Sequence, residues 1–442
     1  MQVIHHGASE GVTGSCHQLV IDSSRSLLID CGIFQGNDAK GRDESKIDFS
    51  LLGVKGLIVT HIHLDHVGRI PYLMSAGFNG PIYCSPPTAR LLPLTLEDAM
   101  RVGVTRNQKL IERFLTDLRR HIYPLAYDKW HEIDGGIEIR LKPAGHVLGS
   151  AIVEVQHDDE RFVFSGDLGS SHQPLLDQPQ SPERADFLVL ECTYGDRIHE
   201  NREERTKRLE DILCHTMENS GVTIIPAFSI GRTQELLYEM NEIFHRVENR
   251  CGCALLHAVN VIVDSPLANR FTKIYEDLRE YWSEEAHHVL TYDDQPLVFN
   301  NLVQIDESED HRDYVNFLKD SKRPAVVIAA GGMCAGGRVV NYLKAFIENP
   351  TTDVIFVGFQ AQGTPGRYIQ DSDWVRLDGK RYDVRAGIHT LGGYSAHADQ
   401  AELLSFVEGM RERPKAIRLV HGEAIPKAAL TRELEQRGYK VV

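Results

Sequence analysis

Three histidines and one aspartate, His61, His63, Asp65 and His66, lie within six consecutive residues. Imidazole nitrogens and carboxylate oxygens are the ligands that zinc and similar divalent ions take in proteins. An apolar, strand-like run at 56–60 precedes the segment, and a helical pattern of apolar residues follows it. A short loop held between a strand and a helix can direct alternate side chains toward one point. The segment therefore predicts a metal site.

Four other segments place one ligand-type residue at the end of an apolar run. These residues are Asp30, His146, Asp167 and His421. Each signal is weak alone, because an aspartate before a glycine is a common turn and a lone histidine is usually structural. Strand ends on one rim of a sheet sandwich can, however, converge on a single cleft. Together with the segment at 61–66, they predict one site built from several strand ends.

The elements that must hold these residues change in character near residue 201. Before about 195, short β-rich runs separated by glycine-containing turns follow one another, interrupted by one helical stretch at about 88–118. From 201 onward, helical and β-rich runs alternate, which predicts a parallel α/β sheet. The expected helices are at 205–217, 233–247, 267–281 and 339–347, and the expected strands at 222–226, 259–263, 325–329 and 353–358. Because the β-rich texture returns after about 375, we expect an α/β domain inserted into a discontinuous first domain.

Length and composition are those of a globular protein with more than one domain. The 442 residues exceed the usual size of a single domain, and the hydrophobic and charged fractions, 42% and 25%, are ordinary. No apolar run is long enough to span a bilayer, and the first residues read as a strand rather than a signal peptide. The eight cysteines are scattered, with Cys251 and Cys253 as the only close pair. This pattern favours reduced thiols and a cytoplasmic location.

The formal net charge of −15 argues, taken alone, against a nucleic-acid partner. Affinity for phosphates normally comes from lysine and arginine. A pair of bound divalent cations and a local basic groove can nevertheless hold a polyanion on an acidic protein. Net charge therefore does not decide whether the substrate is a nucleic acid.

The order Asp30, the segment 61–66, His146 and Asp167 resembles the metallo-β-lactamase superfamily. Further segments resemble, more narrowly, the β-CASP nucleases, whose known members process RNA or DNA. These segments are Glu191–Asp196, Pro226–Gln234, Gly331–Gly337, Gly393–Asp399 and Val420–Glu423. The resemblance covers essentially the whole chain. It departs from the usual pattern at Cys192 and Gly332, neither of which is a proposed ligand.

The resemblance implies the α/β fold class, as a metallo-β-lactamase αββα sandwich with an inserted parallel α/β β-CASP domain. The implied domains are 1–200 for the first part of the sandwich, 201–370 for the insertion and 371–442 for the second part. We expect the substrate to enter a cleft between the sandwich and the insertion. Because only 21 residues follow His421 in this sequence, we expect no appended RNA-binding domain after it.

The resemblance also implies two zinc ions and a partition of their ligands. One zinc would bind His61, His63 and His146, and the other would bind Asp65, His66 and His421. Asp167 would bridge both ions, which could then share a hydroxide and hold a phosphoryl oxygen. Asp30 is expected to orient a ligand imidazole rather than to bind metal itself. The histidines without a matched role, which we treat as structural, are His5, His6, His172 and His389.

Phosphodiester cleavage also needs a proton for the leaving oxygen. The family match makes His397 the general acid, with Glu191 accepting a hydrogen bond from it. The catalytic set is therefore expected to be Asp65, Asp167, Glu191 and His397. For substrate binding we expect Ser229 and Arg232, at a strand-to-helix turn, and Arg338, beside a glycine pair. Intramolecular ion pairs are an equally good expectation for the two arginines.

The sequence thus predicts a zinc-dependent ribonuclease that hydrolyses single-stranded RNA as an endonuclease or 5′-exonuclease. A DNA nuclease of the same superfamily is one alternative, disfavoured because DNA-acting relatives commonly lack a histidine matching His421. A small-molecule hydrolase, such as a lactamase, lactonase or thioesterase, would lack the inserted domain. A subunit that only binds RNA would have lost metal ligands, whereas all of them are present. We expect no membrane partner, and the oligomeric state stays open, with a homodimer as one option.

Overall fold

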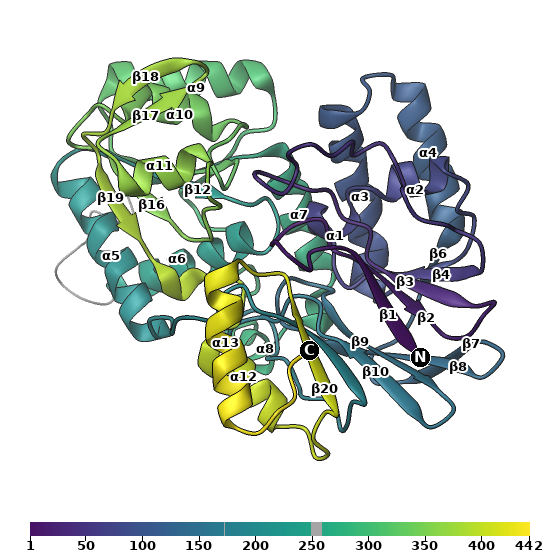
Figure 1. Ribbon diagram of the computed structural model, residues 1–442. Helices are drawn as coiled ribbons and strands as arrows, with labels where there is room; N and C mark the ends of the chain where they lie inside the picture. The colour runs from purple at the N-terminus through teal and green to yellow at the C-terminus, as the bar shows by residue number, and fades with distance from the viewer. Residues whose placement is uncertain (172, 249–258) are drawn as a thin grey trace. The chain divides into compact units, whose positions relative to one another are not determined.

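The computed structural model describes residues 1–171, 173–248 and 259–442 (Figure 1). Two sequence predictions lie outside the described residues. They are the structural role of His172 and the reduced thiols of Cys251 and Cys253. The chain divides into two compact units. The first contains Met1–Ser171, Leu176–Ile198 and His397–Val442, and the second contains His199–Ala396 with a short segment ending at Leu175.

The first sheet of the first unit contains six strands in sequence order. They are β1 (Gln2–Gly7), β2 (Cys16–Val20), β3 (Ser26–Ile29), β4 (Val54–Ile58), β5 (Ile82–Cys84) and β6 (Ile122–Pro124). The first three strands pair antiparallel, and the others continue in parallel. The amino-terminal strand expected from the sequence is present as β1.

The second sheet of this unit also has six strands, in the order β20-β11-β10-β9-β8-β7. They are β7 (Trp130–Asp134), β8 (Ile137–Pro143), β9 (Ala151–His157), β10 (Glu160–Phe164), β11 (Phe187–Glu191) and β20 (Ala416–Val420). Side chains from both sheets, including Leu27, Ile29, Val153 and Val155, share one hydrophobic core. The two sheets therefore pack face to face as a sandwich.

Helices cover the outer faces of this sandwich. On the first sheet they are α1 (Leu64–Val67), α2 (Ile70–Ser75), α3 (Pro86–Gly103) and α4 (Gln108–His121). On the second sheet they are α12 (Gln400–Glu408) and α13 (Ala424–Gln436), which share a core with β11 and β20 through Leu188, Leu419 and Leu430. The layers confirm the predicted αββα sandwich.

One helical expectation was wrong in detail. The stretch expected as a single helix at 88–118 is two helices, α3 and α4. Gly103 ends α3, and Asn107 begins α4, because its side chain accepts hydrogen bonds from the backbone N–H groups of Lys109 and Leu110. An asparagine cap of this kind stabilises a new helix start. Because the helical spacing of apolar residues continues across this break, the sequence pattern does not reveal where one helix ends and the next begins.

The second unit is built on a parallel sheet of six strands in the order β14-β13-β15-β12-β16-β19. The strands are β12 (Val222–Ala227), β13 (Asn260–Asp264), β14 (Leu302–Gln304), β15 (Ala325–Ala330), β16 (Asp353–Phe356) and β19 (Gly387–Thr390). The central strands β12 and β15 are buried almost throughout. Strands covered on both faces read as continuous apolar runs, which is how the sequence revealed them. The predicted parallel α/β insertion is confirmed.

Helices connect the strands of the second unit. They are α5 (Arg202–Glu218), α6 (Arg232–Glu248), α7 (Pro266–Asp277), α8 (Glu284–Val289), α9 (Ser308–Ser321), α10 (Val339–Phe346) and α11 (Pro365–Asp371). A hairpin of β17 (Trp374–Leu377) and β18 (Lys380–Asp383) leads into β19. Because β19 pairs with β16, residues 371–396 belong to this unit, although the sequence division placed 371 onward in the sandwich. No helix in the described ranges is long and apolar enough to cross a membrane.

Candidate metal centre

Three histidines from two loops of the first unit converge on one carboxylate. His61 and His63 follow β4, and His146 follows β8. The Nδ1 atom of His63 lies 3.1 Å from Nε2 of His61 and 3.0 Å from Nε2 of His146. The Oδ2 atom of Asp167 lies 3.4 Å from His61 Nε2 and 3.6 Å from His146 Nε2. These four ligand atoms can surround a single metal ion.

A second group of side chains faces the other oxygen of the same carboxylate. The Oδ1 atom of Asp167 lies 3.3 Å from Nε2 of His66 and 3.6 Å from Nε2 of His421. The Nε2 atom of His421 is in turn 3.3 Å from Oδ2 of Asp65. Asp65 and His66 belong to α1, and His421 follows β20. The two oxygens of Asp167 thus face two different ligand groups, as a bridging carboxylate would.

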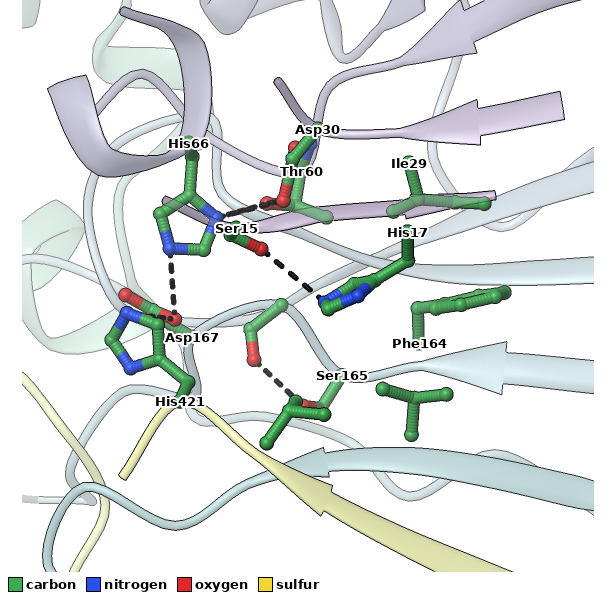
Figure 2. A pocket seen from close by; sticks show the side chains of 13 residues that line it. Ser15, His17, Ile29, Asp30, Thr60, His66, Phe164, Ser165, Asp167 and His421 are labelled. Carbon is green, nitrogen blue, oxygen red and sulfur yellow. Dashed lines mark hydrogen bonds and ion pairs between the residues drawn. The ribbon is translucent and has the colours of Figure 1, made fainter. Parts of the chain in front are cut away.

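Asp30 and Thr60 set the orientation of two of these imidazoles, and Figure 2 shows one of them, His66. Asp30 accepts hydrogen bonds from the backbone N–H and the hydroxyl of Thr60, both at 2.8 Å, and from Nδ1 of His66 at 2.7 Å. His66 therefore carries a proton on Nδ1 and turns Nε2 toward Asp167. The Thr60 hydroxyl donates to Asp30, so its oxygen accepts a hydrogen bond from the Nδ1–H of His61 at 3.1 Å. Such outer hydrogen bonds fix the tautomer of metal-binding histidines.

Thr193 plays the matching role at His421, and sequence reasoning missed it. Its hydroxyl lies 2.6 Å from Oε2 of Glu191 and 3.0 Å from Nδ1 of His421. A hydroxyl has one proton to donate, and the carboxylate is the closer and stronger acceptor. The threonine oxygen then accepts from Nδ1 of His421, which turns Nε2 toward the ligand group. The available signals were the position of Thr193 inside the segment 191–196 and, for Thr60, its place directly before His61.

His397 lies against the buried carboxylate of Glu191. Its Nδ1 atom is 3.1 Å from each oxygen of Glu191, whose side chain is fully buried at the end of β11. The backbone N–H of Leu168 donates to the same carboxylate at 2.7 Å. The segment around His397 is held by a hydrogen bond from the N–H of Ala398 to the carbonyl of Leu168. The structure therefore brings His397 and Glu191 together beside Asp167, and the role of His397 as general acid stays a prediction.

Electrostatics at the centre suit a bound cation. Burial and the neighbouring imidazoles hold the pKa of His61 well below its usual range, and burial lowers the pKa of His63 to about 4. Both imidazoles are therefore neutral at pH 7 and keep the lone pairs that a metal needs. Burial alone would raise the pKa of Asp167, but His421, His66 and His61 outweigh it and keep that carboxylate ionised. The buried atoms Nε2 of His66 and Oδ1 of Asp167 face each other at 3.3 Å without hydrogen-bond geometry, which fits two ligands of one metal ion.

Two residues at the centre adopt a backbone conformation that side chains rarely take. Asp30 has φ 60° and His421 has φ 52°, both in the left-handed region. This region costs roughly 1–3 kcal/mol for residues other than glycine. The contacts of Asp30 with Thr60 and the hydrogen bond from the N–H of His421 to the carbonyl of Ala8, at 2.8 Å, hold the two turns. The strained backbone conformation at each residue directs its side chain toward the centre.

The residues predicted to contact substrate phosphates belong to the second unit. Arg232 is buried in the first turn of α6 and forms an ion pair with Glu235. Arg338 donates to Oδ1 of Asp264 and to the carbonyl of Asp306, both at 2.6 Å. The hydroxyl of Ser229 lies 3.1 Å from that of Ser265. Both guanidinium groups thus make the intramolecular contacts that were the alternative expectation, and their role toward substrate stays a prediction.

Three family models match successive parts of the chain. The metallo-beta-lactamase superfamily model matches residues 12–204, the Beta-Casp domain model matches 233–369, and a model described as a Zn-dependent metallo-hydrolase RNA specificity domain matches 381–442. The segment 61–66, His146 and Asp167 fall within the first match, and His397 and His421 within the third. The family and the His/Asp groups together imply bound metal ions.

Curated relatives match over most of the chain. A ribonuclease from Thermus thermophilus is 36% identical over 447 aligned residues, which cover 100% of this chain and 97% of that protein. The transcription termination factor FttA of Methanosarcina mazei is 30% identical over 94% of this chain, and that of Pyrococcus horikoshii is 32% identical over 83%. This chain spans 66% and 57%, respectively, of those two factors.

A solved structure supports the same fold. A protein of unknown function from Enterococcus faecalis superposes with a TM-score of 0.55 over 100% of this chain and 97% of its own, at 13% identity. The likeness at this identity concerns the fold alone. With the family models and the full-length relative, it leads to one conclusion: the chain belongs to the metallo-β-lactamase superfamily of hydrolases and, within it, to the β-CASP family.

Proposed function

We propose that the protein is a ribonuclease that binds two zinc ions and hydrolyses phosphodiester bonds of single-stranded RNA. The observation that carries the proposal is the carboxylate of Asp167, whose two oxygens face two separate groups of ligand atoms. Two-metal sites with ions about 3.5–4 Å apart serve phosphoryl transfer in many hydrolases. The names of the relatives and the RNA specificity model support RNA as the substrate.

The ligand assignment follows the two groups. We assign His61, His63 and His146 to one zinc ion and Asp65, His66 and His421 to the other, with Asp167 between them. When bound, two such ions supply an activated water and neutralise charge on the phosphoryl group. The chain's own contribution is to orient the imidazoles through Asp30, Thr60 and Thr193. The nearly complete burial of Asp167 keeps its bridging position fixed.

We assign the protonation of the leaving oxygen to His397. Its Nδ1 faces Glu191, so the proton on Nε2 is the one available to substrate. Burial lowers the pKa of His397, but the charge of Glu191, its hydrogen bond and the nearby aspartates raise it to about 9. The ring is therefore protonated at neutral pH, as a general acid must be.

The alternatives differ in what they would hydrolyse. A DNA nuclease is disfavoured because His421 is present and in ligand position, and a lactamase or thioesterase because the second unit and the segment at 393–399 are present. We also propose a cytoplasmic protein, with a homodimer as one option. The test is kcat/KM for single-stranded RNA, duplex RNA, single-stranded DNA, a β-lactam and a thioester at one salt concentration. Single-stranded RNA should be preferred by far, whereas turnover of the thioester or lactam with RNA left intact would overturn the proposal.

Metal content provides an independent test. Elemental analysis of the purified protein should give two zinc ions per chain, and Asp167→Asn should lower both occupancies because it weakens the shared ligand. Surface Asp158→Asn, in an exposed turn, is a matched control that should leave the content unchanged. An active protein that reproducibly holds no transition metal would show the assignment to be wrong.

A further inference from the structure

A cavity of about 450 Å³ lies in the first unit, outside the ligand groups. Its walls come from the end of β1 with the loop that follows it, residues 5–13, and from the segment after β3, where Phe34, Arg42 and Phe49 line it. Cavities of about 300–1,000 Å³ are typical of sites for small molecules or parts of larger ligands. None of the residues assigned to metal binding or proton transfer lines this cavity.

Both walls rest directly on the loops that carry the metal ligands. The carbonyls of Ala8 and Gly11 accept the N–H groups of His421 and Gly422, at 2.8 and 3.2 Å. On the other side, the N–H of Ile33 donates to the carbonyl of Leu64, between His63 and Asp65, at 2.9 Å. The cavity therefore adjoins the metal centre. When the scissile phosphate of an RNA strand lies at that centre, a neighbouring nucleotide can reach the cavity.

Two pairs of stacked flat groups line the cavity. The rings of His6 and Phe49 lie parallel, with centroids 3.9 Å apart and 12° between their planes. Burial lowers the pKa of His6, so this imidazole is neutral at pH 7. Across the same cavity, the guanidinium of Arg42 stacks over the ring of Phe34 at 4.1 Å. Aromatic rings and stacked arginines are the surfaces on which single-stranded nucleic acids place their bases.

The charged residues of the lining favour a base over a phosphate. Glu10, Asp38 and Asp48 line the cavity, against one arginine, Arg42. The carboxylate of Asp38 accepts the N–H groups of Val12 and Thr13, both at 3.0 Å, so it fastens the two walls together. The remaining acidic groups repel phosphate but can accept hydrogen bonds from the amino groups of a base.

We propose that this cavity binds one unpaired base of the RNA, from a nucleotide next to the scissile phosphate, stacked on the His6–Phe49 pair. The inference rests on the proposed ribonuclease function, whose substrate it describes in more detail. It assigns a binding role to His6, which the sequence had marked as structural. It also accounts for a preference for single strands, because a base held in a duplex cannot leave its stack.

The test is an abasic scan on the zinc-loaded, full-length protein. A single-stranded RNA with one cleavage site is prepared in variants that lack one base at a time on either side of that site. We expect kcat/KM to fall roughly 5- to 100-fold at one position, the usual worth of a stacked base. Phe49→Ala should lower kcat/KM for intact RNA by a similar factor and should abolish the extra loss at that position.

Two further variants separate stacking from folding. Phe49→Trp keeps a stacking surface and should retain the response to the missing base. Leu52→Ala, at a side chain that is 92% exposed and does not line the cavity, is a matched control that should behave as wild type. Melting temperature and zinc content are measured for all variants, and Arg42→Ala provides a second test if Phe49→Ala does not fold.

The outcomes distinguish the two proposals. If the wild type cleaves RNA but responds equally to missing bases with and without Phe49, the base site is wrong and the ribonuclease proposal stands. If Arg42→Ala and Phe49→Ala both leave kcat/KM and abasic sensitivity unchanged, the site is likewise wrong. If the wild type does not cleave RNA at all, the proposed function itself has failed.

Discussion

At the scale of single residues, one hydroxyl decides which nitrogen of His421 faces the metal centre. Thr193 donates to Glu191 at 2.6 Å and accepts from Nδ1 of His421. Thr193→Val removes both hydrogen bonds while keeping the shape, so zinc affinity should fall about 10- to 100-fold. Thr193→Ser should retain most of it. Chelator competition measures the effect, and equal affinities for valine and serine would contradict the tautomer argument.

The roles of the two histidines beyond residue 390 can be separated by metal content. His421→Ala should weaken or empty one site, because it removes one of the few protein ligands that we propose for that site. His397→Ala should keep both metals and slow the single-turnover rate by roughly 10²–10⁴-fold, the usual worth of a general acid. Zinc analysis and single-turnover kinetics on both variants decide the matter. A zinc lost with His397→Ala but not with His421→Ala would mean that the roles are reversed.

The pH dependence of cleavage should report the contact between His397 and Glu191. This contact raises the pKa of His397 to about 9, above the unfolded value of about 6.5. The contribution of this pair to folding stability is therefore fully present below about pH 6.5. It is lost as the pH rises through about 9. Activity should likewise fall as His397 loses its proton. In Glu191→Gln the alkaline limb of the pH–rate profile should move to lower pH, and an unmoved limb would exclude His397 as the acid.

At the scale of elements, the site is made from strand ends, and that is why much of it could be predicted. Asp30, His61, His146, Asp167 and His421 each follow a strand, and a strand with its following turn is a local pattern. The outer contacts were not predictable in the same way, because Thr193 meets His421 across 228 positions. Similarly, Arg338 contacts Asp264, which lies 74 positions away in the sequence. The sequence alone therefore could not show whether Arg338 forms an ion pair or contacts a phosphate.

Two helices of the second unit are joined by a buried ion pair. Arg205 in α5 has no exposed side-chain surface and lies 2.8 Å from Glu235 in α6. Arg205→Ala removes this buried charge, although Glu235 keeps its ion pair with Arg232. The loss of unfolding free energy should therefore reach at most about 3–5 kcal/mol, the usual cost of breaking a buried pair. Arg208→Ala, on the same helix with 46% exposure, should cost less than about 1 kcal/mol. Urea unfolding of both variants tests this, and equal losses would contradict it.

At the scale of the whole molecule, the chain is acidic, with a net charge of −15, yet we propose a polyanionic substrate. Divalent ions would reverse the local charge at the centre when bound, and the proposed stacking in the 450 Å³ cavity needs no positive charge. Composition could not predict this, because net charge averages over surfaces that never meet the substrate. The first boundary between the two units was visible in the sequence near residue 201, where alternating helical and β-rich runs begin. The second boundary could not be predicted in this way, because it depends on the pairing of β19 with β16.

The most direct test of the account is the source of the oxygen on the product phosphate. The zinc-loaded protein cleaves single-stranded RNA in ¹⁸O-labelled water under single-turnover conditions, and mass spectrometry reads both new ends. Attack by an activated water predicts one ¹⁸O atom on a 5′-phosphate and an unlabelled 3′-hydroxyl. An unlabelled 2′,3′-cyclic phosphate with a 5′-hydroxyl would show that the ribose hydroxyl attacks instead, and the proposed two-metal hydrolysis would be wrong.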